Sequence, residues 1–161
     1  MDHLWSPWRY RYVSKAEKTE GCIFCSKPQQ NRDAENLILH RGLHCYVILN
    51  RYPYTTGHLM VVPYAHVATL EAASAESLQE LMALTSAASR HLRSVYRPEG
   101  MNIGMNIGEC AGAGIAGHLH MHLLPRWPGD VNFMTSIGET RVIPEDLETT
   151  YQRLSRAFAE T

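Results

Sequence analysis

The chain has 161 residues, of which 45% are hydrophobic and 19% charged, and its formal net charge at pH 7 is −1. This length fits a single domain that buries about two thirds of the surface of its unfolded chain. The near-neutral charge argues against nucleic acid as a partner, so any binding of phosphate has to be local. No apolar run approaches the roughly 18 residues of a membrane span, and the N-terminus lacks the pattern of a signal peptide, so we expect no membrane partner.

Residues 1–20 have the composition of an N-terminal arm with aromatic and basic side chains. Within it, residues 5–12 read Trp-Ser-Pro-Trp-Arg-Tyr-Arg-Tyr. Such a segment can stack on a base and contact phosphate. It can also pack on the body of the protein or on a partner subunit, which is the interpretation that we favour.

Four cysteines occur in the chain, two of them as Cys22-Ile-Phe-Cys25. This usage fits a reducing compartment better than a disulfide framework, so we expect a cytoplasmic protein. The Cys-x-x-Cys spacing is compatible with a redox couple, with half of a zinc site or with two buried free thiols. A thioredoxin-type couple needs a βαβ context, which the polar residues 26–36 do not provide.

Alternating and helical patterns predict five strands and two main helices. The strands are expected at residues 37–40, 45–49, 58–62, 101–107 and 118–124. One helix begins after Ser74 and stops before Pro98, and the other begins near Pro144. Short connections between sequential strands predict an antiparallel sheet with the long helix on one face. We therefore expect one α+β domain over residues 1–161, with residues 139–161 as a helical C-terminal tail.

Residues 118–122 read His-Leu-His-Met-His, a strict alternation. On a strand this pattern places the three imidazoles on one open face, with neighbours about 7 Å apart. The preceding residues 108–117 include four glycines, so their backbone N–H groups can turn inward and cradle an anion. A phosphate site beside a nucleophile is one interpretation, and metal binding by a His-x-His pair or a structural role are the others.

The run His118-Leu-His-Met-His-Leu-Leu resembles the signature of the histidine triad (HIT) superfamily of nucleotide hydrolases and transferases. Residues 49–53 and 57–63 resemble the nucleotide-binding strands of that family. Residues 4–9 and the tail from 126 to 144 resemble its bacterial diadenosine tetraphosphate phosphorylase branch. The resemblance implies a HIT-like fold with a five-stranded antiparallel sheet and two main helices, and it implies a homodimer.

The resemblance also implies roles for the three histidines. His120 is the expected nucleophile, because a neutral imidazole attacks without prior deprotonation and holds the nucleotidyl group as a phosphoramidate. His122 is expected to contact an α-phosphate oxygen or the bridging oxygen. His118 is expected to support the fold and, together with Cys22, Cys25 and His66, to bind one structural zinc ion, as in some relatives.

A further set of residues is expected to bind the substrate. The set consists of Asn50, His58, Asn106, Gly112, Gly114, Ile115, Arg126 and Trp127. Asn50 matches a family position that contacts ribose or phosphate, and His58 matches a neighbour of the triad. Hydrolases of the family usually carry Gln followed by Ser or Thr where this chain has Gly114 and Ile115, so a side-chain hydroxyl is absent there. Arg126 is expected to offer charge to a second phosphate, or else to form a surface ion pair.

The leading hypothesis for function is a nucleotidyl transferase that cleaves diadenosine tetraphosphate by phosphorolysis. Inorganic phosphate then resolves the nucleotidyl-histidine, and the products are ADP and ATP. A hydrolase that releases AMP from dinucleoside polyphosphates or phosphoramidates is the first alternative. A nucleotide-binding sensor with weak activity, and a metalloenzyme that uses all three triad histidines as ligands, are the others.

Overall fold

A five-stranded antiparallel sheet forms the centre of the computed structural model, which describes residues 21–130 and 143–159. The strands are β1 (Ile38–Arg41), β2 (Cys45–Leu49), β3 (Leu59–Pro63), β4 (Gly100–Gly104) and β5 (Met121–Arg126). Their order across the sheet is β1-β2-β3-β5-β4, and every neighbouring pair is antiparallel. The predicted α+β architecture is confirmed. The expected N-terminal arm lies outside the described residues.

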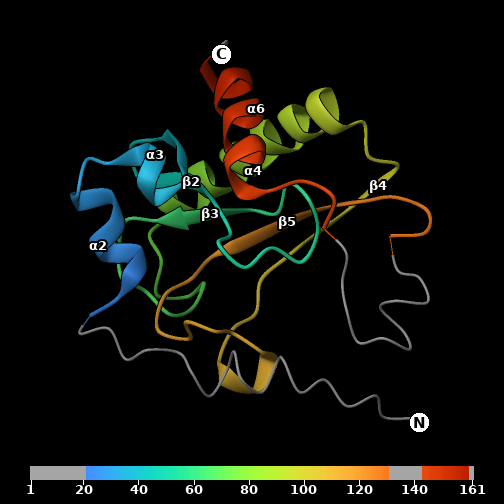
Figure 1. Cartoon of the computed structure of the whole chain (residues 1–161). Coiled ribbons are helices and arrows are strands. Elements are labelled where there is room, and N and C mark those ends of the chain that lie inside the picture. The colour runs from blue at the N-terminus through green and yellow to red at the C-terminus, as the bar shows by residue number, and fades with distance from the viewer. Residues whose placement is uncertain (1–20, 131–142, 160–161) are drawn as a thin grey trace, which may run out of the picture.

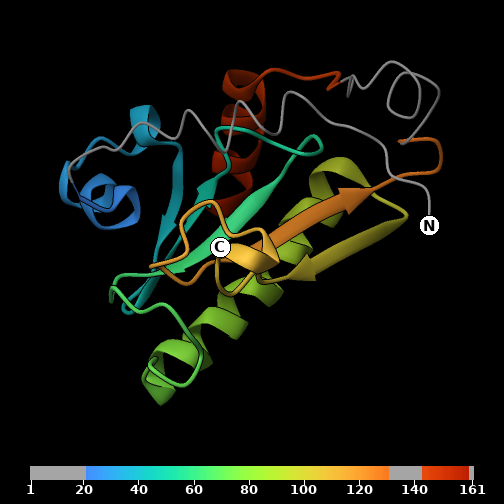
Figure 2. The same cartoon turned by 90° about the horizontal axis from the view of Figure 1, so that it is seen from below.

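Helices cover this sheet unequally. The helical segments are α2 (Ile23–Gln29), α3 (Asp33–Asn36), α4 (Ala75–Tyr96), the 3-10 turn η1 (Glu109–Ala111) and α6 (Leu147–Ala159). Figure 1 shows α4 and α6 on one side of the sheet and η1 on the other. Figure 2 looks onto that second side, where the segment with η1 crosses in front of the strands. Among the described residues, no helix is both long and apolar enough to span a membrane.

The long helix α4 begins where the sequence predicts. The Ser74 hydroxyl accepts a hydrogen bond from the Ser77 N–H at 3.2 Å, which caps the N-terminus. Arg97 ends the helix in the left-handed region with φ 47°. One stripe of the helix is buried against the sheet: Ser77, Leu81, Thr85, Ala88 and Leu92.

The two central strands β2 and β3 are buried along their whole length because both of their faces are covered. The Cys45 side chain points to α4, where its thiol lies 3.4 Å from the Ser77 carbonyl. The next residue, Tyr46, points to the other face and donates from its hydroxyl to the Phe24 carbonyl of α2 at 2.8 Å. The sheet is thus packed between α4 and α2, and neither α2 nor α3 was expected from the sequence.

The predicted strand at 118–124 is displaced, because β5 begins only at Met121. Its partner β3 ends at Pro63, which has no N–H to donate, and the Pro63 carbonyl accepts from the His118 ring at 2.8 Å. The backbone turns away instead, and the Leu119 N–H donates to Val67 at 2.7 Å. The expected open row of histidines on a strand is therefore wrong: all three imidazoles are buried, and only His122 lies on the strand.

The end of β4 and the start of α6 also differ from the boundaries predicted from the sequence. The strand expected at 101–107 ends at Gly104, opposite His122, and β5 extends only one residue further, to Met121. The last helix begins at Leu147 and not near Pro144. Its N-terminus is capped by the Asp146 carboxylate, which accepts from the Thr149 N–H at 2.8 Å.

A single carboxylate holds the turn between β1 and β2. Glu80 of α4 accepts hydrogen bonds from the N–H groups of Leu43, His44 and Cys45 at 2.8, 2.5 and 2.6 Å. Burial opposes ionisation of this carboxyl, but the three donors outweigh it and lower the pKa of Glu80. Gly42 is needed beside it, because a Cβ there would stand 2.8 Å from a Glu80 carboxylate oxygen.

We expect Glu80→Ala to lower the free energy of unfolding by about 1–3 kcal/mol, because three N–H groups lose their acceptor. Urea unfolding at pH 7 measures the loss. Gln79→Ala, at an exposed position of the same helix, is the control and should change stability by less than about 0.5 kcal/mol. Equal effects of the two substitutions would contradict the role given to Glu80.

Candidate functional site

Four buried histidines lie together at the ends of β3 and β5. His118, His120 and His122 come from the start of β5 and the residues before it, and His58 directly precedes β3. The His58 and His122 rings are 5.1 Å apart between centroids, and those of His120 and His122 are 4.8 Å apart. The sequence alternation therefore does bring the triad together, although in a buried site.

The backbone determines which nitrogen of His118 carries the proton. Its Nε2 lies 2.8 Å from the Pro63 carbonyl oxygen, which can only accept. The proton is therefore on Nε2, and the lone pair of Nδ1 points to the cysteine sulfurs, 3.3 Å from Cys22 Sγ. This is the tautomer that a metal ligand needs.

The same reasoning gives His120 the opposite tautomer. Its Nδ1 lies 2.7 Å from the His118 carbonyl oxygen and must donate to it, which leaves the lone pair on Nε2. Burial lowers the pKa of His120 and outweighs the stabilising effect of that hydrogen bond on the charged form. The Phe24 ring packs on this imidazole at 5.0 Å. The result is a neutral imidazole with a free nitrogen nucleophile.

His122 is oriented by His58. The Tyr54 N–H donates to His58 Nδ1 at 3.2 Å, so the His58 proton is on Nε2. That Nε2–H lies 2.9 Å from His122 Nδ1, which accepts, and His122 must then carry its own proton on Nε2. Burial, and then the charge of neighbouring His120, lower the pKa of His122 to about 4. A neutral His122 thus presents an N–H donor.

Asn50 belongs to the same hydrogen-bonded chain. Its Oδ1 accepts from the Tyr52 N–H at 3.0 Å, which fixes the amide so that Nδ2 faces His58 Nδ1 at 3.4 Å. Asn50 and His58 are both buried. The structure therefore places these two expected substrate-binding residues beside the triad, and Asn50 assists the donor that sets the His58 tautomer.

Four side chains form a cluster that fits a zinc ion. The ligand atoms of Cys22, Cys25, His66 and His118 all lie within 4.8 Å of one another. The Cys25 sulfur is 3.4 Å from His66 Nδ1 and 3.5 Å from His118 Nδ1. A tetrahedral zinc ion with two sulfur and two nitrogen ligands has S···N edges of about 3.5 Å. Burial and the neighbouring Cys22 thiol raise the pKa of Cys25, so a nearby cation is what would stabilise its thiolate.

The cluster leaves two triad histidines outside it. Within the described part of the chain, this is the one group of three or more metal-ligating side chains with converging ligand atoms. His120 and His122 have their Nδ1 atoms engaged by a carbonyl and by His58. The geometry therefore fits a structural metal beside the triad better than a metal held by the triad itself.

The glycine-rich segment leads directly into the triad. It contains η1, and Gly108 and Gly112 flank that turn with φ of 84° and 90°, values that favour glycine. The His118 N–H donates to the Ile115 carbonyl at 3.3 Å, which ties the end of the segment to the first histidine. Gly112 and Gly114 belong to this segment, and Asn106 lies two residues before it. Figure 1 shows η1 on the side of the sheet opposite α4.

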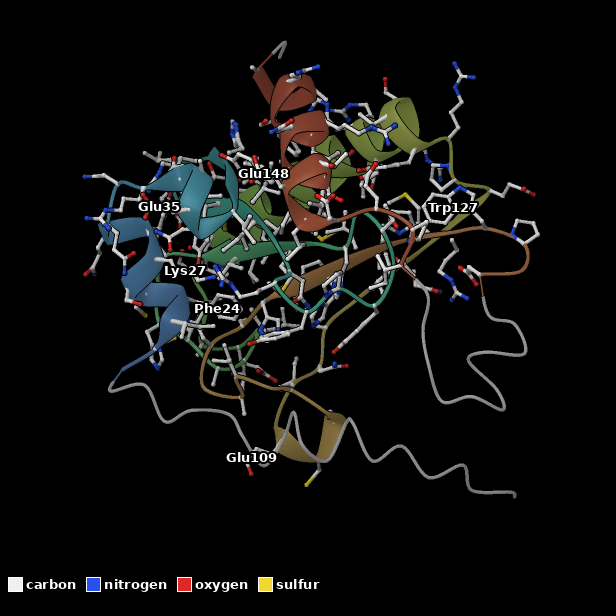
Figure 3. All side chains as sticks on the ribbon, viewed as in Figure 1. Phe24, Lys27, Glu35, Glu109, Trp127 and Glu148 are labelled. Carbon is white, nitrogen blue, oxygen red and sulfur yellow. The ribbon has the colours of Figure 1, made fainter. Side chains whose placement is uncertain are left out.

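Arg126 and Trp127 lie away from the histidines. Arg126 is four residues beyond His122 on β5, about 13 Å along the strand. Its guanidinium pairs with both Asp130 carboxylate oxygens, at 2.6 and 2.8 Å, and with Asn102 at 2.6 Å. Trp127 packs edge-on against Tyr96. Figure 3 shows Trp127 far across the molecule from Phe24, and the structure does not bring it to the site.

Two contributors to the site, Phe24 and Tyr54, were not expected from the sequence. Phe24 sits inside the Cys-x-x-Cys motif, where its apolar character was the only signal. Tyr54 acts through its backbone N–H, which no side-chain pattern reveals. Lys27 is half-buried on α2, and burial, then the charge of Arg51, lower its pKa.

Known proteins resemble this chain in sequence and in fold. The chain is 42% identical to the AP-4-A phosphorylase of Mycobacterium tuberculosis, over 99% of this chain and 85% of that one. A Zn-bound histidine triad family protein from Mycobacterium smegmatis has a TM-score of 0.70 and 26% identity, over 87% of this chain and 94% of that one. A hypothetical histidine triad nucleotide-binding protein from Sulfolobus tokodaii has a TM-score of 0.69 and 26% identity, over 86% and 93%. The HIT domain model matches residues 31–129, well over half of the chain, and the protein therefore belongs to the HIT family.

Proposed function

We propose that the protein is a nucleotidyl transferase that cleaves diadenosine tetraphosphate by phosphorolysis to ADP and ATP. The observation that carries this proposal is the pair of complementary tautomers, with a lone pair on His120 Nε2 and a proton on His122 Nε2. A nucleophile and a hydrogen-bond donor on neighbouring neutral imidazoles are what attack on a phosphoanhydride requires. The 42% identical relative named AP-4-A phosphorylase supports the choice of substrate and acceptor.

In the first step, His120 Nε2 attacks the α-phosphorus and forms a P–N bond. The bond from that phosphorus to the bridging oxygen breaks, and ATP leaves while the His122 N–H donates a hydrogen bond to the departing oxygen. In the second step, an oxygen of inorganic phosphate attacks the same phosphorus. The P–N bond then breaks, His120 regains its lone pair, and ADP is released. We place the α-phosphate oxygens against Asn106 and the backbone of Gly112, Gly114 and Ile115.

We also propose that Cys22, Cys25, His66 and His118 bind one structural zinc ion. The converging ligand atoms support this set, as does the Zn-bound relative from Mycobacterium smegmatis. Zinc would join α2 to His118, two residues before the nucleophile His120, and would take no part in the transfer steps.

Three further proposals concern the domain organisation, the cellular compartment and the oligomeric state of the enzyme. We propose that residues 1–161 form one domain and that the protein acts in the cytoplasm, which its four free thiols support. We propose a homodimer on the resemblance to the family. Strand β4 supports it, because it lies at the edge of the sheet with Ile103 47% exposed.

Incubation with diadenosine tetraphosphate tests the function. We expect ADP and ATP at a rate that rises with phosphate concentration, measured by chromatography of the nucleotides. His120→Asn should lower the rate by at least about 1,000-fold, because the covalent nucleophile is lost while the residues that bind the nucleotide remain. AMP released at a phosphate-independent rate would make the protein a hydrolase, and tight binding without turnover would make it a sensor.

Metal analysis tests the zinc proposal. Purified protein should contain about one zinc ion per chain, and removal by a chelator should lower Tm, since structural zinc contributes to folding. Cys25→Ser should lose most of the zinc, whereas Cys110→Ser, at an exposed cysteine outside the cluster, should retain it. Equal zinc content in the two variants would refute the ligand set.

The buried histidines make stability depend on pH. In the unfolded chain His122 takes up a proton as the pH falls through about 6.5, whereas in the folded chain its pKa is about 4. Stability present above pH 6.5 is therefore lost between pH 6.5 and 4, by about 3 kcal/mol for this residue. Burial lowers the pKa values of His118 and His120 in the same direction.

Urea unfolding at pH 7, 6 and 5 measures this loss. The window stays above the range in which most carboxylates titrate. His122→Asn cannot titrate at this position, so its stability should fall less steeply with pH than that of the wild type. Identical slopes would show that His122 is not held neutral by the fold.

A further inference from the structure

Lys27 lies on α2 with Phe24, the residue whose ring packs on the proposed nucleophile, and it has no role in the transfer steps. It follows Phe24 by three residues on α2, so the two side chains share one face of the helix, about one turn apart. The Phe24 ring contacts the His120 ring at 5.0 Å. Figure 3 shows Phe24 and Lys27 on the same side of α2. Lys27 thus extends from the same face of α2 as the ring that contacts His120.

A second cation, Arg51, converges on the same region. Arg51 follows Asn50, and its Nη2 lies 3.5 Å from the Glu35 carbonyl oxygen of α3. The next residue, Asn36, donates from Nδ2 to the Lys27 carbonyl at 3.3 Å, which fixes α3 against α2. The loop after β2 therefore brings the Arg51 guanidinium to the helix pair that carries Lys27.

Neither cation has a carboxylate partner in the described part of the chain. Arg32, Arg41, Arg126 and Arg153 each pair with an acidic side chain there. Glu35 meets Arg51 only through its backbone carbonyl in the described part of the chain, and its carboxylate pairs with Arg32. Two neighbouring cations, one of them half-buried, repel each other and are costly to desolvate without an anion. That cost is recovered when an anion binds between them.

We propose that Lys27 and Arg51 form a subsite for a phosphate group of the nucleotide other than the α-phosphate that His120 attacks. The imidazoles of the triad are held neutral and supply donors but no positive charge, whereas a dinucleoside polyphosphate brings several negative charges. Lys and Arg are the side chains that bind phosphate through charge-assisted hydrogen bonds. The inference rests on the proposed function for the identity of the nucleotide. The phosphate group is either further along the polyphosphate chain or attached to the ribose.

Binding measurements on the His120→Asn protein test the subsite without turnover. Calorimetric Kd values are compared for AMP, for ATP and for adenosine 3′,5′-bisphosphate. We expect Lys27→Met, which keeps the apolar stem, to weaken one of the last two ligands by about 10- to 100-fold, because a charge-assisted hydrogen bond is lost. AMP binding should change by less than about 2-fold. The affected ligand identifies the source of the phosphate.

Three further variants make the result specific. Arg51→Met, at an exposed position, should weaken the same ligand, and Lys27→Arg should restore most of its affinity. Arg32→Gln, which removes a nearby surface cation already paired with Glu35, is the control and should leave all three affinities unchanged. Equal weakening of AMP and the second ligand, or no weakening of any, would overturn the subsite.

The outcome is separable from that of the proposed function. If diadenosine tetraphosphate gives no ADP and ATP while Lys27→Met still weakens the bisphosphate or ATP selectively, the proposed function fails and the subsite stands. If phosphorolysis proceeds and Lys27→Met leaves every affinity unchanged, the subsite fails and the proposed function stands.

Discussion

The hydrogen bond between the His118 ring and the Pro63 carbonyl is the constraint on which the rest of the site depends. It uses the last carbonyl of β3, so the ladder with β5 stops and the backbone from His118 to His120 leaves the sheet. It also fixes the His118 proton on Nε2, which turns Nδ1 to the cysteines. The His118 carbonyl, free of the ladder, then accepts from His120. One contact thus links the end of a strand, the metal cluster and the nucleophile.

The other tautomers follow from groups that cannot change their role. A backbone carbonyl only accepts and a backbone N–H only donates, so the Tyr54 N–H and the His118 carbonyl orient His58 and His120 without ambiguity. Burial keeps His120 and His122 neutral by lowering their pKa values. A charged imidazole would lose either the lone pair on His120 or the acceptor on His122. The fold therefore selects the one protonation state in which attack and hydrogen-bond donation are both available.

The sequence patterns predict which elements and residues form this site better than they predict the geometry of those residues. Strand β2 and the cap of α4 at Ser74 lie where periodicity and capping chemistry predict, and the alternation at 118–122 identifies the triad. The burial of those histidines and the short helices α2 and α3 were not predicted, since they arise from contacts distant in sequence. Glu80 illustrates the limit: its partners are the backbone N–H groups of a turn more than thirty residues earlier, which no side-chain pattern marks.

Helix α2 links the cysteine–histidine cluster to the proposed nucleophile, because it carries residues that contact both. Both cysteines belong to its first turn or directly precede it, and its Phe24 packs on His120. Seven residues are too few for a helix to be stable by itself. Its place therefore depends on the Tyr46 hydroxyl, on the Asn36 amide and on the cysteine–histidine cluster. A zinc ion at that cluster would hold α2 so that Phe24 packs on the nucleophile while Lys27 offers its charge one turn further along.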